Sequence, residues 1–512
     1  MTTLIPHWIR GAEASGTSGR TAPVHNPATG EQTAEVALAS TDDVATAVAS
    51  AKEAAIAWRE SSLSRRSAVL FAFRQLLHER TDELAAIITA EHGKVLSDAA
   101  GEIARGLENV EFATGVPNLL KGGFSEQAST GVDVYSMRQP LGVVAGITPF
   151  NFPAMVPLWM CANAIACGNA FVLKPSEKDP SAANWIAKLW QEAGLPDGVF
   201  TVVHGDKEAV DALLTHPDVS AISFVGSTPI AKYIYETGTS HGKRVQALGG
   251  AKNHALVLPD ADLDMAADAL VSAAYGAAGE RCMALSVAVA VGDIGDELVA
   301  KVAQRLPGLR VGDGAAEGTD MGPLITAEHR DKVRGYIDAG EAAGATLVAD
   351  GRTGDHPQEG YFLGTTLLDH VTPEMTVYTD EIFGPVLAVT SFDGYDNAME
   401  IANDTRYGLN ASVWGKDLRR AARIGAQLEA GNVNVNDGFA ASFASKGTPS
   451  GGWKASGVGV RHGDAGLLKY TDTTNLATLK QQVYNPRPGQ SYEQYAQQTK
   501  QVLRWMRKLR IR

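Results

Sequence analysis

Residues 142–153 read GVVAGITPFNFP, an apolar run that ends in a turn containing two prolines. Short apolar runs bounded by glycine and proline are typical of fully buried strands. Similar runs occupy residues 170–173, 199–203 and 221–224, and helical segments at 181–194 and 207–215 fall between them. This alternation of strand and helix predicts a parallel α/β sheet.

The flanking segments extend the pattern in both directions. Residues 41–58 and 63–100 read as amphipathic helices, and residues 131–138 alternate like a half-exposed strand. A second α/β region is expected after residue 260, with helices near 261–278, 297–305, 326–344, 396–405 and 416–429, and strands near 285–291, 346–349, 386–391 and 433–435. Residues 152–173 carry no charge, but prolines and asparagines interrupt them, so a buried helix is expected there and not a membrane span.

The composition describes an ordinary globular protein and narrows its partners. The 512 residues are 45% hydrophobic and 20% charged, and the formal net charge of -13 argues against nucleic acid as a main partner. Three cysteines fit a reducing cytoplasm and not a disulfide framework. Residues 1–11 lack the features of a signal peptide, so we expect a cytoplasmic protein with no membrane partner.

One cysteine stands in a loop of small residues, GAAGERCMALS at 276–286. A nucleophilic cysteine needs thiolate character, and Arg281 directly before Cys282 supplies a neighbouring cation. Small neighbours let the backbone approach closely and leave room for a substrate. A lone cysteine is also often just a small buried hydrophobe, so this loop alone leaves both interpretations open.

Polar groups follow the predicted strands, where binding loops collect. Asn151 offers an amide that can stabilise an oxyanion, which is worth about 3 kcal/mol, although it can equally be a plain turn residue. The run KPSE at 174–177 brings a cation and a carboxylate suited to the ribose and phosphate of a dinucleotide. The run FVGST at 224–228 opens a helix whose free N–H groups suit a pyrophosphate, and DEIFGP at 380–385 adds a carboxylate and an aromatic ring.

In this order, TPFNFP, KPSE, FVGS, GERC and EIFGP resemble the aldehyde dehydrogenase superfamily, over residues 8–476. The resemblance implies that Cys282 forms a thiohemiacetal and then a thioester, and that Asn151 and the Cys282 N–H stabilise the oxyanion. It also implies NAD as cofactor and no metal. The cofactor-binding residues expected are Thr148, Phe150, Lys174, Glu177, Lys178, Gly226, Ser227, Gly249, Glu381 and Phe383.

The same resemblance implies a domain plan. It consists of a Rossmann-type NAD-binding domain (1–128 and 143–256), an α/β catalytic domain (257–450) and a small β bridge for oligomerisation (129–142 and 465–485). A homo-oligomer, dimer or tetramer, is expected. Residues 486–512 form a basic tail, for which a solvated or subunit-contacting role is favoured over a membrane surface.

Position 247 departs from the hydrolytic members of the superfamily. They read ELGG, with the glutamate as the base that activates water, whereas residues 247–250 here read ALGG. Water has a pKa of about 15.7 and a free thiol a pKa of about 8.5, so hydroxide is about seven units harder to form than a thiolate. A site that lacks this base is therefore better suited to a thiol acceptor, coenzyme A, than to water.

Three further runs resemble one subgroup, the CoA-acylating methylmalonate-semialdehyde (malonate-semialdehyde) dehydrogenases. They are GAKNH at 250–254, RGLENVEFA from Arg105 and RCMALS from Arg281. In that subgroup the arginines matching Arg105 and Arg281 bind the substrate carboxylate, which guanidinium grips with two parallel hydrogen bonds. The alternative for Arg105 is a surface ion pair with Glu102 or Glu108 at helical spacing.

The C-terminal part, from about residue 400, looks different. The runs YGLNASVW, GGWKASG, RHG and LLKYT between 407 and 471 are closer to hydrolytic, succinate-semialdehyde-type dehydrogenases. The sequence thus favours oxidation of malonate or methylmalonate semialdehyde to acetyl-CoA or propionyl-CoA with loss of CO2. A hydrolytic NAD(P)-dependent dehydrogenase of succinate semialdehyde or another aldehyde is the second interpretation, and a non-catalytic scaffold or binding protein is the third.

Overall fold

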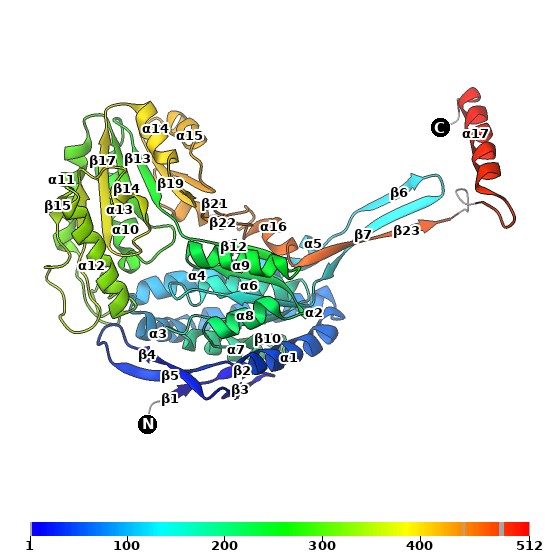
Figure 1. Ribbon diagram of the computed structural model, residues 1–512, viewed down its shortest axis with the longest axis horizontal. Helices are drawn as coiled ribbons and strands as arrows, with labels where there is room; N and C mark the ends of the chain where they lie inside the picture. The colour runs from blue at the N-terminus through cyan, green and yellow to red at the C-terminus, as the bar shows by residue number, and fades with distance from the viewer. Residues whose placement is uncertain (1–2, 444–445, 481–485, 511–512) are drawn as a thin grey trace. The chain divides into compact units, whose positions relative to one another are not determined.

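The computed structural model describes residues 3–443, 446–480 and 486–510. They form two compact units (Figure 1). The first unit runs to residue 119 and resumes over 140–471, and the second comprises residues 120–139 and the described residues from 472 onward. Both predicted α/β regions belong to the first unit.

An eight-stranded sheet contains the alternation that begins at residue 143. Its five central strands are parallel, in the order β12 (Arg244–Leu248), β11 (Val219–Val225), β8 (Val143–Ile147), β9 (Ala170–Lys174) and β10 (Phe200–Val202). The antiparallel edges are β22 (Gly457–Val458) beside β12 and β2 (His7–Ile9) with β3 (Ala12–Ala14) beyond β10. The chain order reverses between β8 and β11, the position at which open α/β sheets bind ligands.

Helices cover both faces of this sheet (Figure 1). One face carries α1 (Thr41–Arg59), α8 (Lys207–Thr215) and α9 (Thr228–Ser240), and the other carries α6 (Met155–Ala166) and α7 (Ser181–Glu192). All twelve residues of α6 are buried. The buried helix expected from the uncharged stretch is therefore confirmed.

The single helix predicted over 63–100 is wrong. The segment forms α2 (Leu63–Glu79), α3 (Thr81–His92) and the start of α4 (Leu96–Thr114). Gly93 ends α3 with a φ of 90°, a left-handed conformation that glycine adopts without strain. A Cβ there would lie 2.6 Å from Pro323 Cγ, so the tight approach also requires glycine. The break turns Lys94 into the interior.

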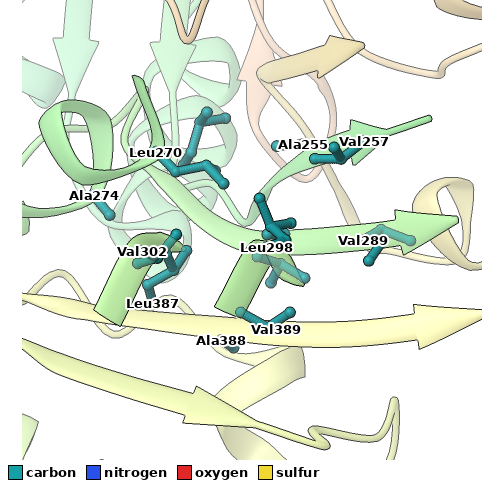
Figure 2. Packing of buried hydrophobic residues seen from close by; sticks show 14 of the residues in the cluster. Ala255, Val257, Leu270, Ala274, Val289, Leu298, Val302, Leu387, Ala388 and Val389 are labelled. Carbon is teal, nitrogen blue, oxygen red and sulfur yellow. The ribbon is translucent and has the colours of Figure 1, made fainter. Parts of the chain in front are cut away.

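A seven-stranded sheet forms the second α/β region. Its order is β15 (Thr346–Ala349), β16 (Thr366–Asp369), β17 (Val386–Phe392), β14 (Leu285–Val291), β13 (Asn253–Val257), β19 (Asn410–Trp414) and β20 (Asn432–Val435), and only β15 is antiparallel to its neighbour. Figure 2 shows α10 (Leu263–Tyr275) and α11 (Gly295–Arg305) packing apolar side chains such as Leu270 and Leu298 against Val289 and Leu387. This cluster is the core of the region.

Several helices here are shorter than their apolar patterns predict. The structure has α12 (Ala327–Ala342), α14 (Tyr395–Asn403) and α15 (Leu418–Gly425). The remaining elements of the first unit are β1 (Thr3–Ile5), β4 (Arg20–His25), β5 (Gln32–Leu38), α5 (Val116–Leu119), α13 (Thr376–Thr379), β18 (Tyr407–Gly408), β21 (Trp453–Lys454) and α16 (Gly463–Leu468). Strands β1, β5 and β4 form a small sheet that the sequence did not predict.

The second unit is a three-stranded sheet and a helix. The sheet order is β23 (Thr471–Leu479), β7 (Val132–Pro140) and β6 (Phe124–Ser129). Helix α17 (Tyr492–Lys508) begins with a capping box between Ser491 and Gln494, and no residue in it is buried. Over the described ranges, none of the helices combines the length and apolar character that crossing a membrane requires.

Candidate active site

The predicted site is formed by loops that follow strands of the eight-stranded sheet and by loops that precede strands of the seven-stranded sheet. The loops at the carboxyl ends of β8, β9 and β11 belong to the first sheet, and the loops before β13, β14 and β17 belong to the second. One hydrogen bond joins the two sets, since Asn151 Nδ2 in the loop after β8 donates to the Glu280 carbonyl before β14 at 2.9 Å. A second, from the Ala251 N–H to Glu381 Oε1 at 2.9 Å, ties the loop before β13 to the loop before β17. The motifs that are scattered in the sequence thus meet at one place.

The loop before Cys282 is compact and strained. It contains a 3₁₀ turn at Gly276–Gly279 in which Ala277 and Ala278 have φ values of 50° and 52°, a region that costs about 1–3 kcal/mol for a residue other than glycine. A Cβ on Gly279 would lie 2.2 Å from the Gly384 carbonyl oxygen. The small residues therefore serve the close backbone approach that the sequence predicts.

Cys282 is the one partly exposed thiol, since Cys161 and Cys167 are buried. It lines a small pocket together with Asn253, Glu381 and Phe383. Burial raises the pKa of its thiol, the charge of Arg461 lowers it, and the charge of Glu381 raises it. The cation that acts on Cys282 is therefore not the one that the sequence indicates.

The charge of Arg281 is engaged by a carboxylate and not by Cys282. Its Nη2 lies 2.6 Å from Asp98 Oδ1, and its guanidinium lies 5.5 Å from the centroid of the Phe439 ring. The expectation that Arg281 favours the thiolate by adjacency is replaced by an ion pair between Arg281 and Asp98.

Asn151 is more than a turn residue. It is 3% exposed, its amide is bonded to the Glu280 carbonyl, and its own carbonyl accepts a hydrogen bond from Lys94 Nζ at 2.6 Å. Lys94 is fully buried and pairs with Glu102, whose other oxygen accepts the N–H groups of Ala154 and Met155 at the start of α6. Sequence reasoning missed Lys94 and Glu102, because their interactions form only when α4 and α6 pack.

The loop after β9 supplies a buried cation. Lys174 is 6% exposed with its Nζ 3.5 Å from Glu177 Oε2, and burial lowers its pKa while Glu177 raises it. Thr148 donates its N–H to the Lys174 carbonyl, but its buried hydroxyl has no hydrogen-bond partner within the described ranges. An unsatisfied hydroxyl beside a buried ammonium fits a polar ligand such as a dinucleotide. Lys178 next to Glu177 is exposed.

The start of α9 is open to a ligand. Ser227 is its N-cap residue, is exposed, and makes no side-chain cap, so the first N–H groups of the helix are available. Gly226 donates its N–H to Leu248, and a Cβ on Gly249 would lie 2.9 Å from Thr228 Oγ1. Because neither glycine has a side chain, the backbone of this loop can lie close to the start of α9.

Two aromatic residues and a carboxylate complete the predicted cofactor set. Phe383 has a φ of 59°, and its ring meets the Phe150 ring edge-on at 5.9 Å. Burial raises the pKa of Glu381 to about 7, although the hydrogen bond from the Ala251 N–H lowers it. A Cβ on Gly250 would lie 2.0 Å from Glu381 Oε2, so this carboxylate packs directly on the backbone.

Arg105 and Arg281 line one pocket of about 200 Å³, although they are far apart in sequence. Arg105 pairs with Glu108 at 2.7 Å. The other partner that the sequence offered, Glu102, is bonded to Lys94. The pocket wall also includes Asp98, Phe152, Met155, Met283 and Phe439. The structure thus brings the two predicted arginines together beside the residue that follows Cys282.

Ala247 lies inside the eight-stranded sheet. Its partners are Phe224 on β11 and Val458 on β22, and it is 2% exposed within an apolar cluster. A methyl group thus stands, in a strand, where the hydrolytic pattern has a glutamate.

The region of the chain that matches known proteins includes all of these loops. The aldehyde dehydrogenase family model matches residues 14–476. A malonate-semialdehyde dehydrogenase of Pseudomonas aeruginosa is 52% identical over 473 residues, covering 91% of this chain and 94% of the relative. Malonate-semialdehyde dehydrogenase 3 of Geobacillus kaustophilus is 48% identical, with coverages of 92% and 97%.

Solved structures agree with the sequence comparison. The crystal structure of methylmalonate-semialdehyde dehydrogenase from Oceanimonas doudoroffii has a TM-score of 0.91 and 50% identity, covering 93% of this chain and 98% of that one. A Sinorhizobium meliloti protein solved in complex with NAD has a TM-score of 0.91 and 47% identity, with coverages of 94% and 98%. Since the matches run through both sheets and every loop of the site, the chain is an enzyme and belongs to the aldehyde dehydrogenase family.

Proposed function

We propose that this enzyme oxidises malonate or methylmalonate semialdehyde with NAD and transfers the acyl group to coenzyme A. The observation that carries the proposal is the pocket shared by Arg105 and Arg281, whose wall includes Arg281 and Met283, the residues on either side of Cys282. Two guanidinium groups suit a substrate that bears a carboxylate close to its aldehyde. The names of the Pseudomonas, Geobacillus and Oceanimonas relatives support the same substrate class.

The first half-reaction uses the cysteine loop. The Cys282 thiolate attacks the aldehyde carbon, and the Asn151 amide and the Cys282 N–H donate hydrogen bonds to the oxygen that gains charge. Bound NAD would accept a hydride from the carbon of this adduct, and loss of the hydride leaves a thioester on Cys282. The arginines orient the carboxylate and hold the carbonyl within reach of the thiolate.

The second half-reaction releases the acyl group. With Ala247 in place of a base, the acceptor is the thiol of coenzyme A, which ionises far more readily than water. The CoA sulfur bonds to the acyl carbon, and the Cys282 sulfur leaves as a thiolate. The substrate carboxylate leaves as CO2, with a proton taking its place on carbon, so the product is acetyl-CoA or propionyl-CoA.

The cofactor loops fit NAD. Lys174 and Glu177 offer a cation and a carboxylate to the ribose, the unsatisfied Thr148 hydroxyl is available to the same ligand, and the open α9 terminus suits the pyrophosphate. The Glu177 carboxylate repels a 2′-phosphate, so kcat/KM is expected to be higher with NAD than with NADP. A higher value with NADP would remove this role from Glu177.

A single assay tests the proposal: NADH formation from malonate semialdehyde with and without coenzyme A. Without it we expect a burst of about one NADH per site and then a stall, and coenzyme A restores steady turnover in a ping-pong pattern. Equal steady rates in the two conditions would establish the hydrolytic alternative. No NADH in either condition would overturn the assignment of malonate semialdehyde as a substrate.

The assembly and location follow from other features. The exposed edge strands β6 and β23 are suited to pair across subunits, so we propose a homo-oligomer, dimer or tetramer, with the basic tail at a subunit contact or in solvent. Three cysteines that form no disulfide suit the cytoplasm. Light scattering of the full chain measures the oligomer.

A further inference from the structure

Arg461 is a deeply buried cation close to the nucleophile. It follows β22 and is 4% exposed, and its backbone exchanges two hydrogen bonds with Ser450, at 2.8 and 2.9 Å. A cation so far from solvent costs a large amount of free energy unless nearby groups favour it. The backbone pairing fixes where the side chain starts, so the contacts of its guanidinium decide what it does.

Those contacts direct the guanidinium at the Cys282 loop. Its central carbon lies 3.8 Å from the centroid of the Trp159 ring on the fully buried helix α6. Its Nη2 lies 3.8 Å from the sulfur of Met283, the residue after Cys282. A guanidinium stacked on an indole is held in one orientation and keeps its charge.

The two arginines near Cys282 differ in the groups that act on their charges. Arg281 is only 2.6 Å from the Asp98 carboxylate, which offsets its charge. For Arg461, burial lowers the pKa of the guanidinium and the charge of Cys282 raises it. Burial brings that pKa to about 10, so Arg461 is still protonated at neutral pH. In a buried setting water screens the attraction between this cation and a thiolate only weakly.

We propose that Arg461, and not Arg281, is the cation that stabilises the thiolate form of Cys282. The inference rests on the proposed function only in taking Cys282 as the nucleophile. It assigns a role to the RHG run, whose resemblance differs from that of the rest of the chain.

The test is the pH dependence of iodoacetamide alkylation of Cys282 in the full-length enzyme, which needs neither substrate nor cofactor. Removing a buried opposite charge shifts a pKa by about 1–3 units, so Arg461→Met should raise the alkylation midpoint by at least about one unit. At a fixed pH below the midpoint this is about a tenfold loss of rate. Arg461→Lys retains the charge and should recover most of the shift.

Matched variants separate this effect from misfolding. Arg281→Met should leave the midpoint where it is, and Cys282→Ala gives the background from the two buried cysteines. If Arg461→Met does not fold, Arg461→Gln carries the same expectation and replaces it. An unchanged midpoint in the folded neutral variant, or an equal shift in Arg281→Met, overturns the proposal. Either result leaves the CoA assay unaffected, so failure of this inference is distinct from failure of the proposed function.

Discussion

The side-chain amide of Asn151 donates a 2.9 Å hydrogen bond to the carbonyl of Glu280, two residues before the nucleophile. This bond ties the loop after β8 to the loop before β14, and therefore the two large sheets to each other at the site. The residue is held by burial and by a hydrogen bond from Lys94 Nζ to the main-chain carbonyl of Asn151. A donor held in this way requires little reorganisation when charge develops nearby.

Replacing Asn151 with alanine should lower kcat by about a factor of 100–1,000, the usual loss for one oxyanion donor. The KM for the semialdehyde should change little, because the donor acts on the transition state. Asn163→Ala is a matched control, since Asn163 is also a buried amide, on α6, bonded to Trp159 O. Stopped-flow NADH formation measures both, and equal losses would make Asn151 structural only.

Cys282→Ala should abolish NADH formation while NAD still binds, because the side chain forms the covalent bond and lies in a partly open pocket. Cys161→Ala should instead lower the melting temperature and keep turnover, because Cys161 is fully buried on α6. Isothermal calorimetry with NAD and a turnover assay separate these results. Any turnover by Cys282→Ala would exclude the thioester route.

Arg105→Leu and Arg281→Leu should each raise KM for malonate semialdehyde by at least about tenfold, as a lost charged hydrogen bond costs about 1.5–3 kcal/mol. Propanal, which has no carboxylate, should show little change. Arg74→Leu provides the control, because Arg74 has a similar ion pair with Glu111 and is not part of the pocket wall. Equal effects on the two aldehydes would show that Arg105 does not bind the carboxylate and only forms its surface ion pair with Glu108.

Glu381 should make stability fall as the pH rises. Burial raises its pKa to about 7, above the value of 4.5 for an unperturbed glutamate, so the folded state binds its proton more tightly than the unfolded state. The stability due to this proton is complete below about pH 4.5 and is lost as the pH rises through 7. Glu381→Gln keeps a protonated-like side chain, so it should raise the melting temperature at pH 8 and leave it nearly unchanged at pH 5. The reverse order would contradict the burial effect.

Ala247→Glu should not produce an efficient hydrolase. Residue 247 pairs with Phe224 and Val458 and is 2% exposed, so a carboxylate there is buried in apolar surroundings and favours its protonated form. We expect a lower melting temperature and steady NADH production without coenzyme A that stays well below the rate with it. Ala247→Gln controls for size alone. A variant as fast without coenzyme A as with it would show that the strand accommodates a working base.

Local patterns predict much of the fold, and long-range contacts account for what they miss. The buried strands after residue 142 are visible as apolar runs, because a strand covered on both faces needs apolar residues at every position. Strands β1, β4 and β5 at the N-terminus were missed, because their exposed positions break the apolar pattern. The end of α3 at Gly93 is a local signal that the pattern over 63–100 passed over, since glycine adopts the φ of 90° found there without strain.

The residues of the site also divide into those that local patterns predict and those that only long-range contacts reveal. Cys282, Asn151 and the two arginines belong to recognisable runs, and the structure brings them to neighbouring loops. Lys94 stands in no motif, the sequence offers Glu102 only as a surface partner of Arg105, and the RHG run indicates no role for Arg461. The importance of these residues comes from burial and from partners on distant elements. An ion pair can also redirect a residue: Asp98, which precedes Arg281 by 183 residues in the sequence, pairs with its guanidinium at 2.6 Å.

The position of Arg461 late in the chain has a consequence for biosynthesis. A ribosome adds Asn151 and Cys282 long before it adds Arg461 and the edge strand β22. A nascent chain that has folded its early sheets therefore carries the nucleophile without the cation beside it. On the role proposed for Arg461, the Cys282 thiol of such a chain would lack the cation that favours its thiolate and would react more slowly with oxidants or stray electrophiles. The full reactivity of Cys282 would then require the segment that contains Arg461 to be in place.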